Sequence, residues 1–424
     1  MLFIIYIMES EKKIKLEGLQ IGMYVSKIDR PWSETPLAFE GMLIQTNDDI
    51  DTIKKYCEYV FIDSSRGRAA SPMYWLNDFA ENESKKIIDK GASEFDLLRK
   101  AEYQVSSSLG DELEVAKDVY RTINEEIGDT FDDLRLSKKL NLDRIHDSVV
   151  NTVESVIRNP TAFKLLLEFK HADDYSYNHA LRSSVWCAQF GRHLGFSRHD
   201  INELALGGLL LDVGKTQIRT ELLNKKETLT QSEIATFRSH VDTGVRLLAE
   251  SDNIPYSVMQ MVATHHERAN SSGYPQALEN DAIPIFGRIG GIVDSFDAMT
   301  CDRPFRSRPY SPHEAIHDLY KLRGIAFHKD LVEQFIQAIG VYPAGSLVEL
   351  RSGEVGMVIA TNNETRLKPK VMIVLDEKKK AVNQYYPIDL AEQSDLSVRR
   401  ALDHSAYGIK MNELFLANIC EFFA

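Results

Sequence analysis

The stretch GGLLLDVGKT, residues 207–216, gives the clearest indication of a helix that leads into a site. An apolar run ends abruptly there at Asp212, and Gly214 and Lys215 follow. The longer segment INELALGGLLLDVGK places apolar residues at intervals of three and four, which is typical of a helix with a buried face. Glycine is a common helix terminator, and a buried carboxylate or ammonium needs a partner. The stretch therefore predicts a helix that ends at a functional site.

Further segments with the same spacing surround this one. LDRIHDSVVNTVESVIRN, NHALRSSVWCAQFGRHLG, IATFRSHVDTGVRLLAE and SVMQMVATHHE each predict a helix. Gly195 stands where the second of these helices should stop. We therefore expect an all-helical domain over residues 141–340 and a fold class that is mainly α.

The flanking segments have different patterns. Residues 1–66, with GMYVSKIDRPW and EYVFIDSS, predict a small β-rich N-terminal domain. Residues 67–140 predict a helical connector, for which a homodimer contact and packing on its own neighbour both stay open. In residues 341–424, GSLVELRSGEVGMVIATN predicts a hairpin with a Ser-Gly turn, KVMIVLD predicts a strand, and MNELFLANICEFF predicts a terminal helix. We expect a C-terminal β extension there.

Composition excludes several classes of protein. The net charge of −13 argues against a general nucleic-acid binder, so we expect no DNA partner, and an anionic ligand would need a local basic cluster. The four cysteines form no CxxC pair, which favours a reducing, cytoplasmic location. The apolar start MLFIIYIM is much shorter than the roughly 20 residues of a bilayer span. We therefore expect neither an anchor nor a signal peptide.

Side chains that bind metals recur at the ends of the predicted helices. A single histidine such as His179 or His240 would by itself indicate a structural residue, so the inference depends on the whole set. Imidazoles and carboxylates from separate helices suit zinc, manganese, iron or nickel. Adjacent histidines on a helix point about 100° apart, which favours a pair of metals over a single one. The set is His179, Asp212, Lys215, His240, His265, His266 and Asp294.

Several motifs resemble those of a known family. HHERANSSGYP, LDVGK and DSFDAMTCDRPFR, with the spacing between them, resemble the HD-GYP family of bacterial signalling phosphodiesterases, a branch of the HD metal-dependent phosphohydrolases. The segment LQIGMYVSKIDRPWSETPLAFEGMLI resembles the domain of unknown role that often precedes HD-GYP domains, and YPAGSLVELRSGEVGMVIA resembles their C-terminal extension. The resemblance implies an all-helical HD core. It also implies hydrolysis of cyclic di-GMP to pGpG and then GMP, in signalling that could involve a protein partner.

The resemblance also implies roles for individual residues. Lys215 would contact a phosphate, Arg303 and Arg306 would hold the dinucleotide, and Tyr175 replaces the carboxylate that binds a third metal in some members. We therefore expect two divalent metals, with Asp212 and Lys215 at the catalytic position. The implied metal ligands are His179, Asp212, His240, His265, His266 and Asp294, and the loop beside the site is Gly273, Tyr274 and Pro275.

The sequence departs from the family pattern at three positions. Asn270 and Ser271 replace the usual Asp and Gly of the loop, and we expect both changes to be tolerated. Leu211 replaces the histidine of the HD pair and has no lone pair for a metal. Two functions follow: a cyclic di-GMP phosphodiesterase with an impaired metal site, or a catalytically inactive cyclic di-GMP receptor. A nucleotide phosphohydrolase of the wider HD group is disfavoured by the GYP loop.

Overall fold

The computed structural model divides the chain into two compact units, residues 1–93 and residues 94–424. Arg303, Arg306 and the predicted terminal helix at 411–423 lie outside the residues that the structure describes. The described residues are 11–30, 35, 41–64, 66–71, 74, 101–136, 139–169, 175–301, 308–362, 365, 367–393, 395–403 and 406–409.

The described part of the N-terminal unit is an antiparallel sheet with one α-helix and a short 3-10 helix, so the β-rich prediction is confirmed. The strands follow the order β1-β4-β2-β3. Because side chains alternate along a strand, Ile14, Val60 and Ile62 share one buried core with Ile53 of the helix. Thr46 and the side chain of the third helical residue form a capping box at the start of that helix. The elements are β1 (Glu11–Lys15), η1 (Leu16–Gly18), β2 (Tyr24–Ile28), β3 (Met42–Leu43), α1 (Asn47–Tyr56) and β4 (Tyr59–Asp63).

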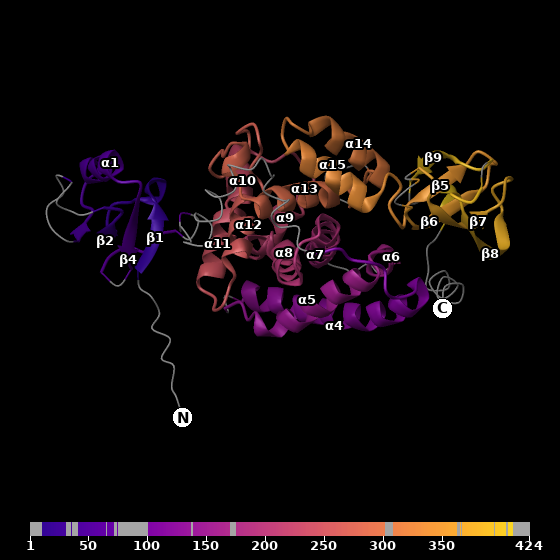
Figure 1. Cartoon of the computed structure of the whole chain (residues 1–424), viewed down its shortest axis with the longest axis horizontal. Helices are drawn as coiled ribbons and strands as arrows, with labels where there is room; N and C mark the ends of the chain where they lie inside the picture. The colour runs from indigo at the N-terminus through magenta and orange to yellow at the C-terminus, as the bar shows by residue number, and fades with distance from the viewer. Residues whose placement is uncertain are drawn as a thin grey trace, which may run out of the picture. The chain divides into compact units, whose positions relative to one another are not determined.

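The second unit begins with a long series of helices, as predicted, and the fold is mainly α (Figure 1). The segment predicted as a connector contributes α4, which packs against α5, α6 and α7. The helices are α4 (Leu109–Arg135), α5 (Asp143–Arg158), α6 (Ala162–Phe169), α7 (Tyr175–Leu194), α8 (Arg198–Leu210), η5 (Val213–Gln217), α9 (Thr220–Leu223), α10 (Gln231–Arg238), α11 (His240–Ala249), α12 (Tyr256–Thr264), η6 (Asn280–Ala282), α13 (Ile285–Thr300), α14 (Pro312–Leu322) and α15 (Lys329–Ile339).

Close packing around α7 brings the predicted site residues together. A Cβ added to Gly208 would lie 2.8 Å from the carbonyl oxygen of Ser183, so glycine lets α8 lie against α7. On another side, Trp186 of α7 packs edge to face on Phe296 of α13, with ring centroids 5.1 Å apart. Aromatic pairs of this geometry add to the apolar burial. The two contacts place the end of α8 and the middle of α13 beside the same part of α7.

Two details of the helices differ from the sequence predictions. The segment IATFRSHVDTGVRLLAE is not one helix, because α10 ends at Arg238 and α11 begins at His240. At this break the ring Nδ1 of His240 lies 2.6 Å from the carbonyl oxygen of Phe237. Gly195 ends α7 with φ of +75°, as predicted. Gly214 has another reason to be glycine, because any Cβ there would overlap the backbone of His240.

The chain continues into a five-stranded antiparallel sheet with the order β8-β7-β6-β5-β9. The predicted hairpin is confirmed: Leu350 N–H donates to Glu354 O at 2.9 Å, and Gly353 has φ of +98°. The strands are β5 (Leu347–Leu350), β6 (Val355–Ala360), β7 (Lys370–Leu375), β8 (Ala381–Asp389) and β9 (Val398–Leu402), followed by η7 (Ala406–Gly408).

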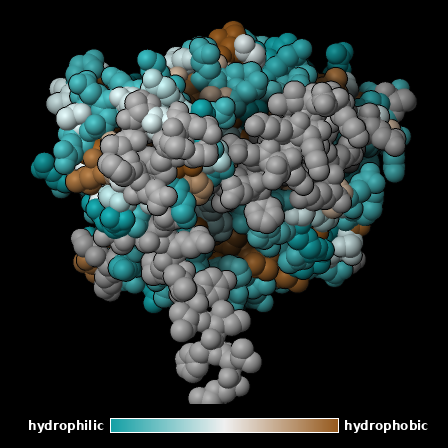
Figure 2. Space-filling model, turned by 60° about the vertical axis from the view of Figure 1, so that its left-hand side comes forward, coloured by the Kyte–Doolittle hydropathy of each residue, from teal (hydrophilic) through white to brown (hydrophobic). Residues whose placement is uncertain are grey.

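The described surface is largely polar. On the face shown in Figure 2, hydrophilic residues dominate and apolar residues form small separate groups. None of the described helices is long and apolar enough to cross a membrane.

Candidate metal centre

The site is built around Asp212, which directly follows the end of α8. Ser197 caps the start of this helix by accepting the N–H of Asp200. At the other end the chain passes from Leu211 into η5, and Asp212 O accepts the N–H of Lys215 at 2.8 Å. The Asp212 side chain is only 11% exposed. A tight turn thus presents a carboxylate to the interior of the helical bundle.

One oxygen of Asp212 faces a group of three histidines. The Nε2 atoms of His240 and His265 lie 3.3 Å and 3.7 Å from Asp212 Oδ1. His266 completes the group, since one ligand atom from each of these four residues lies within 4.8 Å of the others. The rings come from the first residue of α11 and from the two residues that follow α12.

The rings of two of these histidines are oriented by backbone carbonyl groups. His240 Nδ1 lies 2.6 Å from Phe237 O, and His265 Nδ1 lies 2.9 Å from Val262 O. Because a carbonyl oxygen only accepts, each Nδ1 carries a proton, and in the neutral ring the lone pair is then on Nε2. Among the described residues, neither Nε2 has a hydrogen-bond partner, and both are buried. Buried nitrogen atoms with directed lone pairs fit a metal ion.

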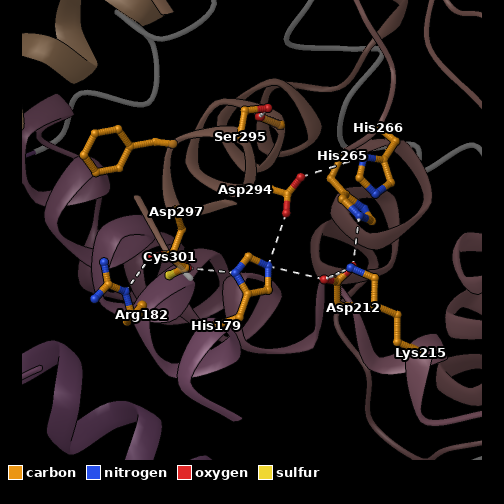
Figure 3. Close-up of polar contacts among 12 residues, drawn as sticks. His179, Arg182, Asp212, Lys215, His265, His266, Asp294, Ser295, Asp297 and Cys301 are labelled. Atoms are coloured by element: carbon orange, nitrogen blue, oxygen red, sulfur yellow. Dashed lines mark hydrogen bonds and ion pairs between the residues drawn. The ribbon is translucent and has the colours of Figure 1, made fainter. Parts of the chain in front are cut away.

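The other oxygen of Asp212 faces a second group of donors (Figure 3). His179 Nε2 lies 3.3 Å from Asp212 Oδ2 and 3.2 Å from Asp294 Oδ1. These three residues have ligand atoms within 4.8 Å of one another. Asp212 therefore belongs to both groups. A carboxylate shared in this way is suited to bridge two metal ions.

The charges within the site shift the pKa values of its members in opposite directions. Burial alone would lower the pKa of His179, but the surrounding carboxylates raise it well above the ordinary value. Burial would raise the pKa of Asp212, yet Lys215 and the neighbouring histidines lower it well below its usual value. Burial, with the adjacent His265, lowers the pKa of His266. These shifts favour an ionised Asp212 and a neutral His266, which are the forms that bind metals, whereas His179 would have to release a proton on binding one.

A third carboxylate, Asp297, supports His179 from behind, and sequence reasoning missed it. Asp297 Oδ2 lies 2.8 Å from His179 Nδ1, and Asp297 Oδ1 accepts from Arg182 Nε at 2.7 Å. The Cys301 thiol also donates to Asp297 Oδ2 at 3.2 Å. Asp297 follows Asp294 by three residues and so lies on the same face of α13. The spacing of three residues could have identified Asp297 from the sequence.

Leu211, the residue in the usual histidine position, lies beside the second donor group. Its side chain is 1% exposed, and a Cβ added to Gly290 would lie 3.3 Å from its Cδ2 atom. Gly290 precedes Asp294 by one helical turn of α13. The second group therefore has an apolar neighbour at the place where the resemblance predicts a nitrogen ligand.

The GYP loop is held against the donors by Glu267. This side chain is buried and accepts the N–H groups of Gln276 at 2.7 Å and Leu278 at 2.9 Å. A Cβ on Gly273 would overlap the backbone of Glu267, so glycine is required there. Tyr274 stacks on His266, with ring centroids 4.6 Å apart and planes 25° apart. The loop thus forms one wall of the site, and Pro275 directly follows the stacked tyrosine.

Lys215 and two residues of α10 lie next to this wall. Lys215 Nζ contacts Asp212 Oδ2 and lies 5.2 Å from the ring centroid of Phe237. The guanidinium carbon of Arg238 lies 4.8 Å from the ring centroid of Tyr274. Sequence reasoning missed Phe237 and Arg238, because an aromatic or basic residue on an exposed helix end gives no distinct pattern.

Comparison with protein families matches the chain in three segments. Residues 168–330 match the family described as HD domain. Residues 11–145 match a domain of unknown function, and residues 347–410 match a KOW domain associated with HD domain.

Curated relatives agree with these matches. A cyclic di-GMP phosphodiesterase of Pseudomonas aeruginosa is 27% identical over 91% of this chain and 90% of that protein. A cyclic di-GMP phosphodiesterase of Thermotoga maritima is 31% identical over 40% of this chain and 46% of that protein. A 3'3'-cGAMP-specific phosphodiesterase of Vibrio cholerae is 32% identical over 38% of this chain and 30% of that protein. The chain thus carries an HD domain between two flanking domains, and it is similar over most of its length to a cyclic di-GMP phosphodiesterase, in agreement with the resemblance to the HD-GYP family.

Proposed function

We propose that the chain is a metal-dependent phosphodiesterase that hydrolyses cyclic di-GMP to pGpG and then to GMP. The observation that carries the proposal is the position of Asp212, with one oxygen facing each of two groups of metal donors. Two relatives named as cyclic di-GMP phosphodiesterases support this substrate, and the relative specific for 3'3'-cGAMP supports the wider class of cyclic dinucleotides.

We propose that the site holds two divalent ions of manganese, iron, nickel or zinc. The donors are imidazole nitrogens and carboxylate oxygens, which suit these metals. The group with three histidines offers four donors, whereas the group with His179 and Asp294 offers three. When bound, such a pair of ions polarises the phosphodiester and lowers the pKa of a water molecule for attack.

The remaining residues would bind and orient the substrate. Lys215 contacts Asp212 in the described structure. We propose that its ammonium group moves to contact a phosphate oxygen when substrate binds. Tyr274, between Gly273 and Pro275, offers an aromatic wall beside His266. Arg303 and Arg306, which lie outside the described residues, would supply positive charge to hold the dinucleotide.

A second function is favoured by Leu211: a receptor that binds cyclic di-GMP without cutting it. The donor group beside Leu211 lacks the nitrogen that the family motif predicts. Binding requires cations and one metal, whereas hydrolysis requires the activated water. Loss of one metal ligand would therefore abolish hydrolysis and still allow the ligand to bind.

The test uses the full chain purified with its metals. Metal content is counted, and the protein is incubated with cyclic di-GMP in manganese or ferrous buffer while pGpG and GMP are followed by chromatography. Asp212→Asn should lose bound metal and product formation, and chelation should do the same. Asp242→Asn serves as the control, because Asp242 is exposed on α11. Binding of cyclic di-GMP without any product would establish the receptor instead. The absence of both binding and product would reject both functions.

Other expectations remain predictions. These are the domain limits 1–66, 67–140, 141–340 and 341–424, a homodimer contact, a signalling protein partner and a cytoplasmic location.

A further inference from the structure

The wall formed by Tyr274 carries a cation that no residue of the metal site uses. Arg238 is the last residue of α10, its side chain is exposed, and its guanidinium carbon lies 4.8 Å from the Tyr274 ring centroid. Among the described residues, no acidic side chain forms an ion pair with Arg238. Contact with an aromatic ring orients a guanidinium but leaves its charge uncompensated.

The position of Arg238 relative to the metal donors is set by short links. Only Ser239 separates it from His240, whose ring is held on the backbone of the same turn. Tyr274, which Arg238 contacts, stacks on His266. Arg238 is therefore connected to two metal-donor histidines, once through the chain and once through a ring.

The other two cations described near this wall have other partners, and Lys215 is already assigned to the reacting phosphate. Lys215 contacts the carboxylate of Asp212, which lies in the interior of the site. Arg268 is turned away and donates to the backbone oxygens of His265 and Glu267, at 2.9 Å and 2.7 Å. In a chain with a net charge of −13, an anion at this wall needs local positive charge. Arg238 supplies it.

A cyclic dinucleotide contains two phosphodiester groups in one closed ring. When one group lies at the metal donors, the other is held away from them by the ring and keeps its negative charge. We propose that Arg238 binds this second, non-reacting phosphodiester, with Tyr274 holding the guanidinium plane in place. The inference rests on the proposed function, since it assumes a cyclic dinucleotide in the site. A guanidinium can donate two parallel hydrogen bonds to a phosphate.

The proposal is tested by comparing two substrates. Cyclic di-GMP has two phosphodiesters, whereas bis(p-nitrophenyl) phosphate has one. Loss of one charge-assisted contact is worth about tenfold in binding. In Arg238→Ala, the KM for cyclic di-GMP should therefore rise about tenfold with little change in kcat. The ratio of kcat/KM for cyclic di-GMP to kcat/KM for bis(p-nitrophenyl) phosphate should fall by a similar factor. Arg238→Lys should recover part of this loss.

Two controls separate the proposal from damage to the site. Arg246→Ala removes an exposed arginine from α11, away from any aromatic partner among the described residues, and should change neither substrate. Metal content should be the same in all variants. An unchanged KM for cyclic di-GMP in Arg238→Ala would overturn the inference, and so would equal losses on both substrates. A wild-type protein that cleaves only bis(p-nitrophenyl) phosphate would instead reject cyclic di-GMP as the substrate, and the inference with it.

A binding measurement gives a second readout that does not depend on turnover. The phosphorothioate analogue of cyclic di-GMP keeps both negative charges and resists hydrolysis. Its Kd should rise about tenfold in Arg238→Ala, and its dependence on salt should become shallower, because one charge pair is lost. This holds whether the wild-type protein is an enzyme or a receptor. Equal Kd values and equal salt dependence in the two proteins would contradict the proposal.

Discussion

Replacing Leu211 with histidine should strengthen metal binding at the weaker of the two donor groups. The group of His179, Asp212 and Asp294 offers three donors. Leu211 is buried, directly precedes Asp212 and packs near Gly290, one turn before Asp294. Changes in the residues that merely support metal ligands alter affinity about 10–100-fold. Adding a direct ligand should change the affinity at least as much.

The same substitution should affect stability with opposite signs in the presence and absence of metal. At saturating metal, a 10–100-fold gain in affinity adds about 1.4–2.7 kcal/mol to the free energy of unfolding. Without metal, a buried imidazole that lacks a partner costs about 1–3 kcal/mol. Each kcal/mol shifts Tm by about 2–4 °C in a domain of this size. The Tm of Leu211→His should therefore lie below wild type in chelator, and manganese should raise it further than it raises wild type.

The assay combines metal counting after dialysis against graded chelator with thermal unfolding in chelator and in manganese. Leu210→His is the matched control, because Leu210 is equally buried but is turned by about 100° on the helix. Leu210→His should lower Tm both in chelator and in manganese, and it should bind no more metal than wild type. If Leu211→His behaves like this control, the side chain at position 211 does not reach the donor group, and the reasoning is refuted.

Three further changes probe other parts of the fold. Asp297→Asn should weaken metal binding about 10–100-fold by loosening His179, with a smaller effect on overall folding in chelator, measured by metal titration. Glu267→Gln should raise the amide exchange rates of the GYP loop, because one of two carboxylate acceptors becomes an amide donor. Burial lowers the pKa of Lys164 to about 7, although Glu168 opposes the shift. The unfolded state therefore binds one more proton than the folded state between about pH 7 and 10, and the free energy of unfolding rises with pH there. Lys164→Met should flatten that part of the pH profile, measured by denaturant titration.

The helical architecture was predictable because periodic apolar residues mark the buried face of each helix and glycines mark helix ends. The hairpin at Gly353 was equally visible, since its turn requires a positive φ. The break at Ser239 was not visible, because apolar spacing continues through it. At the break His240 contacts Phe237 O and faces Asp212, and the second of these contacts is a tertiary one that apolar spacing does not report.

The metal donors could be recognised as a set, but their division into two groups could not. Sequence spacing places His240 and His179 at helix ends or inside helices without saying which oxygen of Asp212 each one faces. That division depends on how α7, α11 and α13 pack, and the packing depends on close approaches at Gly208 and Gly214. Asp297 was within reach of sequence reasoning, because it shares a helix face with Asp294.

The three departures from the family motif differ in what they remove. Asn270 Oδ1 accepts the N–H of Ser272 at 3.2 Å and its hydroxyl at 2.7 Å, and an amide oxygen does this as well as a carboxylate oxygen. Ser271 has φ of +59°, which costs roughly 1–2 kcal/mol relative to glycine but leaves the loop in its place. Of the three departures, only Leu211 removes a nitrogen that would bind a metal in the family motif. The loop departures therefore bear on stability, whereas the choice between cutting and only binding the ligand depends on the metal affinity of the group beside Leu211.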